Sequence, residues 1–179
     1  MLLSAAAVPA ADIAVPAEIQ APLFAKILTF DRSLASHAPR ELVIGILYQR
    51  KVRASLDVKD DFVKALDRIP GGQVAGVAFR SVAIDWDGSN DISAVLTQER
   101  PNVLYVAPLR TVSIEQVAAA ARAQGIHTWT GIPEYVERGL AVGIGLSGDR
   151  PLILVNLTAA RAEGADISSQ LLKIARVLP

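Results

Sequence analysis

Few side chains in this sequence could carry out acid–base or nucleophilic chemistry. The sequence contains two histidines, His37 and His127, and no cysteine. The absence of cysteine excludes disulfides, thiolate metal ligands and a cysteine nucleophile. His37 lies in the polar stretch "SLASHAPRE", which is typical of a solvated loop. Neither histidine has a second metal ligand at helical or strand spacing, so the sequence predicts no metal site.

Two other motifs that can mark catalytic sites have simpler explanations here. Ser147 lies in "GLSGD", which lacks the G-x-S-x-G spacing of a nucleophile elbow and indicates a hairpin turn. Asp85, Asp87 and Asp91 surround a predicted strand-to-helix loop, where turn and helix-cap roles account for them better than a cation site. The sequence offers no complete catalytic set, and we predict a protein that is not an enzyme and needs no cofactor.

His127 and Trp129 form a further candidate pair. They stand two residues apart in "GIHTWTG", and on a strand this spacing points both side chains to the same face. Together they could line a ligand pocket, or they could simply pack in the core. The residues alone leave both interpretations open.

The elements that must position these residues alternate between strands and helices. Apolar, β-branched runs predict strands at 41–48, 77–86, 102–108 and 126–131, and a hairpin at 139–157 that turns at 147–149. Helical spacing and capping residues predict helices at 18–30, 60–69 and 113–125, and within 87–100 a turn followed by a helix that is capped near Ser89 or Asn90. This order predicts an α/β fold: a mainly parallel sheet with an antiparallel C-terminal hairpin and helices on both faces.

The final residues predict one more helix. Gly164 suits a helix stop, and Ser168 and Ser169 suit the cap of a new helix. The apolar residues of this segment then fall on one helical face: Leu171, Leu172, Ile174, Ala175 and Leu178. We expect this C-terminal helix to cover the sheet.

The domain organisation is simple apart from the first residues. A length of 179 residues suits one domain, which we place at 17–179 after a leader at 1–16. In "MLLSAAAVPAAD", Val8 and Ala10 suit the −3 and −1 positions of a signal-peptidase site that cuts before Ala11. The stretch is shorter than a full signal peptide, and the alternative is a disordered alanine-rich tail. The 18 basic and 18 acidic residues cancel, which gives no basic surface for nucleic acid.

The C-terminal third and the first predicted helix carry the motifs of a known family. The matching positions are Asn156-Leu157, Ala159-Ala160-Arg161, Gly164, Ser168-Ser169, Leu171-Leu172 and Ala175. "LFAKILTF", which ends at Phe30, is similar to the family's F-A-K-F helix. On these motifs the sequence resembles the YfiR-like family from about Ile19 to Val177.

The resemblance implies an exported, periplasmic regulator. The best-known members repress a membrane-bound diguanylate cyclase, and so affect cyclic di-GMP signalling, by binding the periplasmic sensory region of that enzyme. It implies a similar membrane sensor as the partner here, with a homodimer and a small-molecule ligand as further options. Export would agree with a truncated signal peptide at the start of the sequence. A periplasmic small-molecule-binding module is the alternative function.

Candidate binding residues follow from the predicted sheet. Ligands of open α/β sheets bind outside the carboxyl ends of the strands. The candidates there are Tyr48, Gln49, Arg110, Trp129, Thr130 and Gly131, although these could also be ordinary loop residues. Arg110 could pair with an anion, and Tyr48 could stack on a ligand. For a protein partner the candidates are Phe24 and Phe30, because two residues six apart cannot both face inward on a regular helix.

Overall fold

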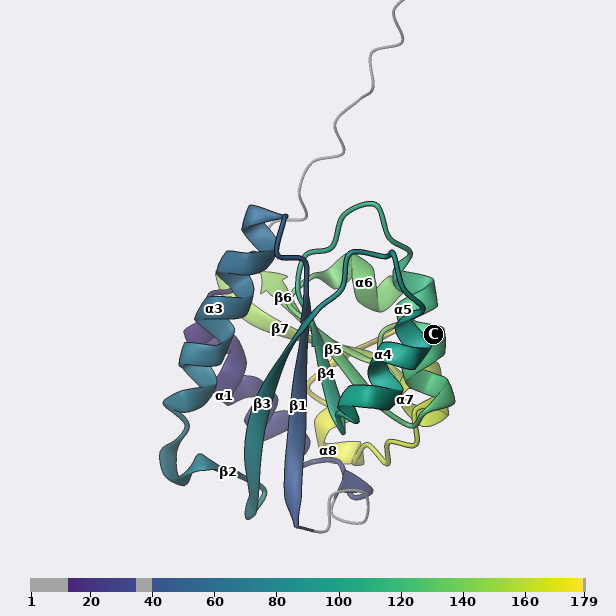
Figure 1. Cartoon of the computed structure of the whole chain (residues 1–179). Coiled ribbons are helices and arrows are strands. Elements are labelled where there is room, and N and C mark those ends of the chain that lie inside the picture. The colour runs from purple at the N-terminus through teal and green to yellow at the C-terminus, as the bar shows by residue number, and fades with distance from the viewer. Residues whose placement is uncertain (1–12, 35–39, 179) are drawn as a thin grey trace, which may run out of the picture.

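The protein folds around one eight-stranded sheet (Figure 1). The computed structural model describes residues 13–34 and 40–178. The strands are β1 (Glu41–Tyr48), β2 (Gln73–Val74), β3 (Val77–Asp85), β4 (Val103–Val106), β5 (His127–Thr130), β6 (Val142–Ser147), β7 (Arg150–Asn156) and β8 (Arg176–Leu178). Their order across the sheet is β2-β3-β1-β4-β5-β6-β7-β8.

The central part of the sheet is parallel, as the alternation of strands and helices predicts. Strands β3, β1, β4, β5 and β6 pair in parallel, whereas β6 and β7 form the predicted antiparallel hairpin. The chain runs from β1 to β3 on one side and then returns to β4 on the other side of β1. The strand order therefore reverses between β1 and β4, which is where parallel α/β sheets usually bind ligands.

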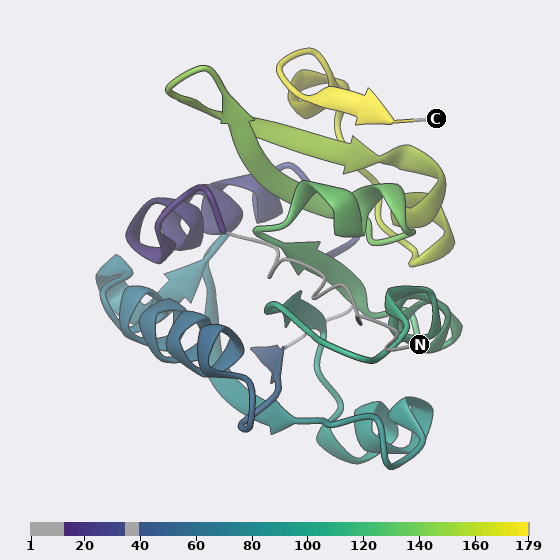
Figure 2. The same cartoon turned by 90° about the horizontal axis from the view of Figure 1, so that it is seen from above.

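Helices cover both faces of the sheet, again as predicted. They are α1 (Ala17–Leu28), α3 (Arg53–Asp67), α4 (Ile92–Glu99), α5 (Ile114–Ala123), α6 (Pro133–Glu137), α7 (Leu157–Ala162) and α8 (Ser169–Leu172), with a 3₁₀ turn η1 (Pro70–Gly72). Figures 1 and 2 show α1 and α3 on one face, and α4 and α5 on the other. The alternating side chains of β4 serve both layers, because Tyr105 packs toward α1 and α3 while Leu104 packs toward α4 and α5.

An aromatic cluster fixes α1 to its face of the sheet. Phe24 is fully buried and stacks on Trp129, with ring centroids 4.6 Å apart. It also meets the edges of Phe62 at 6.1 Å and Tyr105 at 5.9 Å. Such pairs contribute about 0.5–1.5 kcal/mol each beyond their buried area. One side chain of α1 therefore touches α3, β4 and β5.

The predicted C-terminal helix is wrong beyond its first turn. Helix α8 spans only Ser169–Leu172, and the chain continues as β8, which pairs in parallel with β7. Of the predicted apolar face, Leu171 is fully buried, but Ile174 is 65% exposed. A strand at this place pairs backbone groups of Leu154–Asn156 that a helix would leave open at the edge of the sheet. This tertiary gain outweighs the helical spacing of the sequence.

The start of the domain lies against the core. Residues 1–12, with the predicted signal-like stretch, lie outside the described residues. Val15, near the end of the predicted leader, is 1% exposed, and its carbonyl accepts a hydrogen bond from Gln20 Nε2 at 2.6 Å. Within 13–34 and 40–178, no helix has the length and apolar character needed to cross a membrane.

Replacing Phe24 by alanine should test the aromatic cluster. We expect Phe24→Ala to lower the free energy of unfolding by about 3–5 kcal/mol, because it leaves a cavity among three aromatic rings. Ile174→Ala, at an exposed position, should change it by less than about 0.5 kcal/mol. Urea denaturation measures both values, and equal losses in the two variants would contradict the packing described here.

Candidate functional site

Three predicted ligand-binding residues meet at the switch point of the sheet. Gln49 follows β1, and Arg110 lies in the loop after β4. The backbone N–H of Arg110 donates to Gln49 Oε1 at 2.7 Å, and Gln49 Nε2 donates to the carbonyl of Arg110 at 3.0 Å. Tyr48 is buried beside them, with Lys59 Nζ 5.1 Å from its ring centroid. The side chain of Gln49 thus joins the two loops that would border a ligand, while Arg110 lies exposed at their rim.

The next two predicted residues also make internal contacts. Thr130 Oγ1 donates to the carbonyl of Val106 at 3.0 Å. Gly131 lies so close to Gln20 that a Cβ at this position would come within 2.6 Å of its carboxamide. Gln20 in turn accepts a hydrogen bond from the Tyr105 hydroxyl at 3.1 Å. Glycine at 131 is therefore needed for this close approach at the carboxyl edge.

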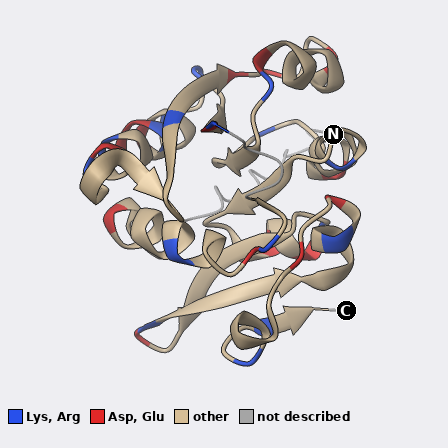
Figure 3. Ribbon diagram, turned by 90° about the horizontal axis from the view of Figure 1, so that it is seen from below, with Lys and Arg blue, Asp and Glu red and all other residues tan. Residues whose placement is uncertain are grey.

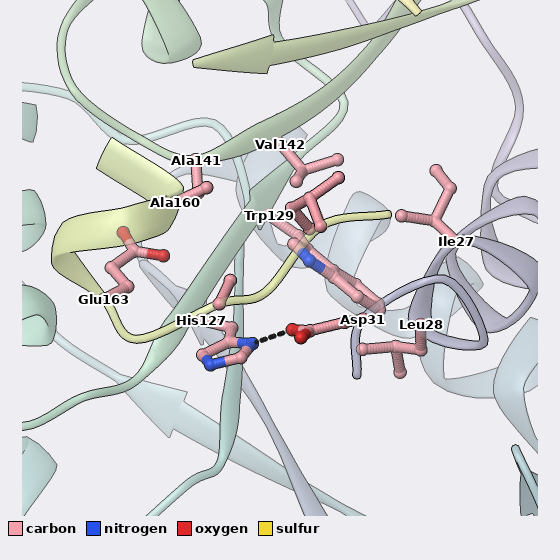
Figure 4. A pocket seen from close by; sticks show the side chains of 11 residues that line it. Ile27, Leu28, Asp31, His127, Trp129, Ala141, Val142, Ala160 and Glu163 are labelled. Atoms are coloured by element: carbon pink, nitrogen blue, oxygen red, sulfur yellow. Dashed lines mark ion pairs between the residues drawn. The ribbon is translucent and has the colours of Figure 1, made fainter. Parts of the chain in front are cut away.

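Trp129, the last of the predicted ligand-binding residues, lines a small cavity together with His127 (Figure 4). The strand spacing predicts this shared face. The remaining walls come from α1, β6, α7 and the segment after α7, and include Asp31 and Glu163. About 10 Å³ is open to the centre of a water molecule, which is roughly the space of one water.

Asp31 and His127 form a buried ion pair at this cavity. The distance from His127 Nδ1 to Asp31 Oδ2 is 2.9 Å, and the two side chains are only 5% and 3% exposed (Figure 4). The other carboxylate oxygen of Asp31 accepts hydrogen bonds from the backbone and hydroxyl of Ser33 and from the backbone N–H of Asp166. Burial alone would raise the pKa of Asp31, but the hydrogen bonds from His127 and Ser33 outweigh it and hold this pKa at about 2.

Glu163 is the second buried acid at the cavity. Its Oε2 accepts a hydrogen bond from the backbone N–H of Thr128 at 2.8 Å, and its Oε1 lies 2.6 Å from Thr128 Oγ1. The same hydroxyl accepts the N–H of Ala141 at 2.8 Å. Burial raises the pKa of Glu163 to about 8, against the smaller, lowering effect of the bonds to Thr128. The first two residues of β5 therefore hold two buried carboxyl groups that differ in protonation at neutral pH.

The sequence gives little warning of these two acids. Asp31 lies just beyond a predicted helix, and its partners Asp166 and His127 are far away in the sequence. Glu163 stands at the C-terminal end of α7, where the helix dipole disfavours a negative charge. That unfavourable placement is the one signal that its carboxyl is unusual.

The cavity offers acid–base groups without room for a substrate. No cluster of three or more acidic or histidine side chains that could hold a metal ion occurs among the described residues. His37 lies in 35–39, outside them. A wider groove of about 330 Å³ lies between α1 and the end of α3, with Pro22 and Ile69 in its wall and Glu18 and Arg68 as its charged groups.

The two predicted partner contacts on α1 and after it differ in exposure. Phe24 is fully buried and presents no surface to a partner. Phe30 is half-buried, and Lys26 Nζ lies 5.7 Å from its ring centroid. Figure 3 shows acidic and basic residues interspersed along the helices, strands and loops, in agreement with the balanced composition.

A protein family matches most of this chain. Residues 18–176 match the model of the YfiR/HmsC-like family. The chain belongs to the YfiR/HmsC-like family. This membership confirms the resemblance found in the sequence. No curated protein sequence matches this YfiR/HmsC-like chain.

Solved structures share the fold of this YfiR/HmsC-like protein at low sequence identity. An ABC domain in complex with L-Trp from Streptococcus pneumonia has a TM-score of 0.64 at 16% identity, over 91% of this chain and 62% of that one. A conserved domain protein from Vibrio cholerae O1 biovar eltor has a TM-score of 0.62 at 15% identity, over 90% and 60%. A ligand-free, open substrate-binding protein with adhesive properties from Clostridium difficile has a TM-score of 0.54 at 18% identity, over 82% and 57%. The chain therefore spans about three fifths of the length of these structures.

Replacing Asp31 should test the buried ion pair. We expect Asp31→Asn to lower the free energy of unfolding by about 3–5 kcal/mol at neutral pH, because it leaves His127 without its carboxylate. The pKa of Asp31 is about 2 in the fold against an ordinary 3.8, so its contribution is present above pH 3.8 and is lost as the pH falls toward 2.

Urea denaturation at several pH values measures this difference. The gap between wild type and Asp31→Asn should shrink over that acidic window. Asp67→Asn, at an exposed carboxyl of α3, serves as the control. A gap that stays constant down to about pH 2 would show that the charge of Asp31 does not stabilise the fold.

Proposed function

We propose that this YfiR-like protein binds and represses the periplasmic sensory region of a membrane-bound diguanylate cyclase or similar sensor. The observation that carries the proposal is the family match over residues 18–176. The protein would act without catalysis. It would bind the inactive state of the sensor more tightly than the active one, and so shift the population toward inactivity.

The solvent-facing side of α1, together with Phe30 just after it, is our proposed contact surface for the sensor, which we call the α1 surface. Ile19 is one of the large apolar side chains that the described structure leaves exposed. Lys26 and Phe30 lie further along the same segment, and the groove between α1 and α3 borders it. A half-buried aromatic beside a cation is a typical anchor of a protein interface, because it is rigid and loses water on binding.

Recovery of the partner from membranes tests this proposal. The exported domain, immobilised and incubated with solubilised membranes, should retain a diguanylate cyclase or similar sensor that mass spectrometry identifies. Phe30→Ala should reduce recovery about tenfold or more, because truncating an interface anchor commonly costs 2 kcal/mol or more. Phe79→Ala is the matched control, since Phe79 is another half-buried phenylalanine and lies on strand β3.

The possible outcomes test the repressor function and the proposed contact surface separately. Recovery of a sensor by wild type and Phe79→Ala but not by Phe30→Ala would support both. Equal recovery by all three proteins would overturn the α1 surface and keep the function. No sensor retained by folded protein would overturn the repressor function itself.

A small-molecule-binding module is the second candidate function. Two of the structural relatives are described as a complex with L-Trp and as a substrate-binding protein, and they share this fold over most of the chain. Arg110, at the rim of the switch point, is the residue that we would expect to pair with an anionic ligand. In this case the ligand would enter between the loops that Gln49 joins.

Thermal denaturation with a panel of small anionic metabolites tests this alternative. A ligand at 100 times its Kd should stabilise the protein by about 2.7 kcal/mol and raise the Tm. Arg110→Ala should remove the shift, whereas Arg161→Ala, an exposed arginine on α7, should retain it. A Tm that no compound raises would count against a free small-molecule sensor.

A further inference from the structure

The last part of the chain is attached mainly at its root. We name residues 164–178 the C-terminal arm. Near its start, the backbone N–H of Asp166 donates to Asp31 Oδ1 at 3.0 Å, and Asp166 pairs with Arg32 at 3.2 Å. The N–H of Ser168 donates to the carbonyl of Phe30 at 2.9 Å, and an isolated bridge joins Asp31 to Ile167. These contacts tie the arm to the segment that follows α1.

Beyond its root the arm is held weakly. Leu171 is the arm's one fully buried apolar side chain among the described residues. Ile174 is 65% exposed and Val177 is 43% exposed. Strand β8 pairs with β7 over three residues only. So little buried area and so short a ladder leave the outer arm at the low end of local stability.

Glu163 stands where the arm begins. Its carboxyl is bound to Thr128 and fully buried, and Asp31 and His127 line the same small cavity (Figure 4). Arg122 of α5 is the further charged group that acts on it. An ionised Glu163 would place a charge in a buried cavity that has space for only about one water to hydrate it.

The chain has a natural hinge at the next residue. Gly164 has a φ of +89°, a conformation that costs glycine little and other residues more. Rotation there would carry the arm away from the segment after α1. The cavity wall formed by Ala165 and Ile167 would leave with the arm, and water would reach the Glu163 carboxyl.

We propose that Glu163 is a proton-controlled latch for the C-terminal arm. With the carboxyl protonated, the arm is closed on Asp31 and β7. With the carboxyl ionised, the arm opens at Gly164 and the carboxylate becomes hydrated. The latch responds to pH near neutrality, which acidic side chains in water do not.

The direction of the effect follows from the pKa of Glu163, which burial raises to about 8 from an ordinary 4.5. The closed arm binds a proton that the open arm releases. The closed state is therefore fully favoured below about pH 4.5, and its advantage declines by roughly a factor of ten per pH unit until about pH 8. Above that pH both states are ionised and the dependence ends.

Opening of the arm would also expose the edge of strand β7, which could bind another protein. Without β8, the Leu154–Asn156 edge of β7 is left unpaired, and such an edge can accept an extended segment of another protein as an added strand. This last step, in which a partner takes the place of β8, rests on the proposed function. The latch itself does not, and its test needs no partner.

Amide hydrogen exchange on the full chain tests the latch. We expect the protection of backbone amides in 165–178, corrected for the intrinsic effect of pH, to fall roughly tenfold per unit between about pH 6 and pH 8 and then to level off. In Glu163→Gln, which keeps the hydrogen bonds of the protonated acid, the protection should be independent of pH. Glu137→Gln, at an exposed carboxyl of α6, should behave like wild type.

A second variant keeps the proposal testable if Glu163→Gln does not fold. Arg122 lowers the pKa of Glu163, so Arg122→Gln should move the levelling-off to higher pH. Flat protection in wild type from pH 6 to pH 8 would overturn the latch. An unchanged slope in Glu163→Gln, or an unchanged end point in Arg122→Gln, would assign the pH dependence to another group and would overturn it equally.

Discussion

Two adjacent residues at the start of β5 hold distant segments of the chain together. His127 holds the carboxylate of Asp31 at 2.9 Å, and the next residue, Thr128, holds the carboxyl of Glu163 through its backbone and its hydroxyl. Asp31 follows α1 and Glu163 ends α7, so two adjacent residues of one strand connect the beginning and the end of the domain. Polar groups buried to this degree are tolerated only when hydrogen bonds replace the lost water, and both carboxyl groups meet that condition.

At the carboxyl edge of the sheet the protein uses its own groups where many α/β proteins bind ligands. Gln49 bonds both backbone polar groups of Arg110, its N–H and its carbonyl, across the switch point, and Gln20 joins Tyr105 to the carbonyl of Val15. These internal bonds position the loops firmly and leave Arg110 at the rim. The carboxyl ends of the strands are thus joined by internal hydrogen bonds, whereas β8 of the C-terminal arm, at the lateral edge of the sheet, pairs over three residues only.

Much of the fold could be predicted from the sequence, because local pattern and burial agree there. All four residues of β4 are buried, and Ser113 caps α5 through its hydroxyl, so hydrophobicity and capping chemistry suffice for both. The C-terminal helix could not be predicted correctly, because its alternative, a strand on the open edge of β7, depends on a partner in the sheet. Asp31 and Glu163 were missed for the same reason: their roles are set by His127 and Thr128, which no local pattern connects to them.

The contacts of Asp31 also suggest why this cavity contains polar side chains where apolar ones could pack. An apolar replacement of a buried ion pair is often as stable or more stable, so stability alone does not explain Asp31 and His127. Apolar side chains would, however, hold the arm by non-directional packing. Such packing allows small shifts of the arm and does not depend on pH. Asp31 instead receives the N–H of Asp166 at one oxygen and His127 at the other, which fixes the arm's register to a single residue. Directional bonds at the root and sparse contacts further out together favour an arm that detaches and returns to the same place.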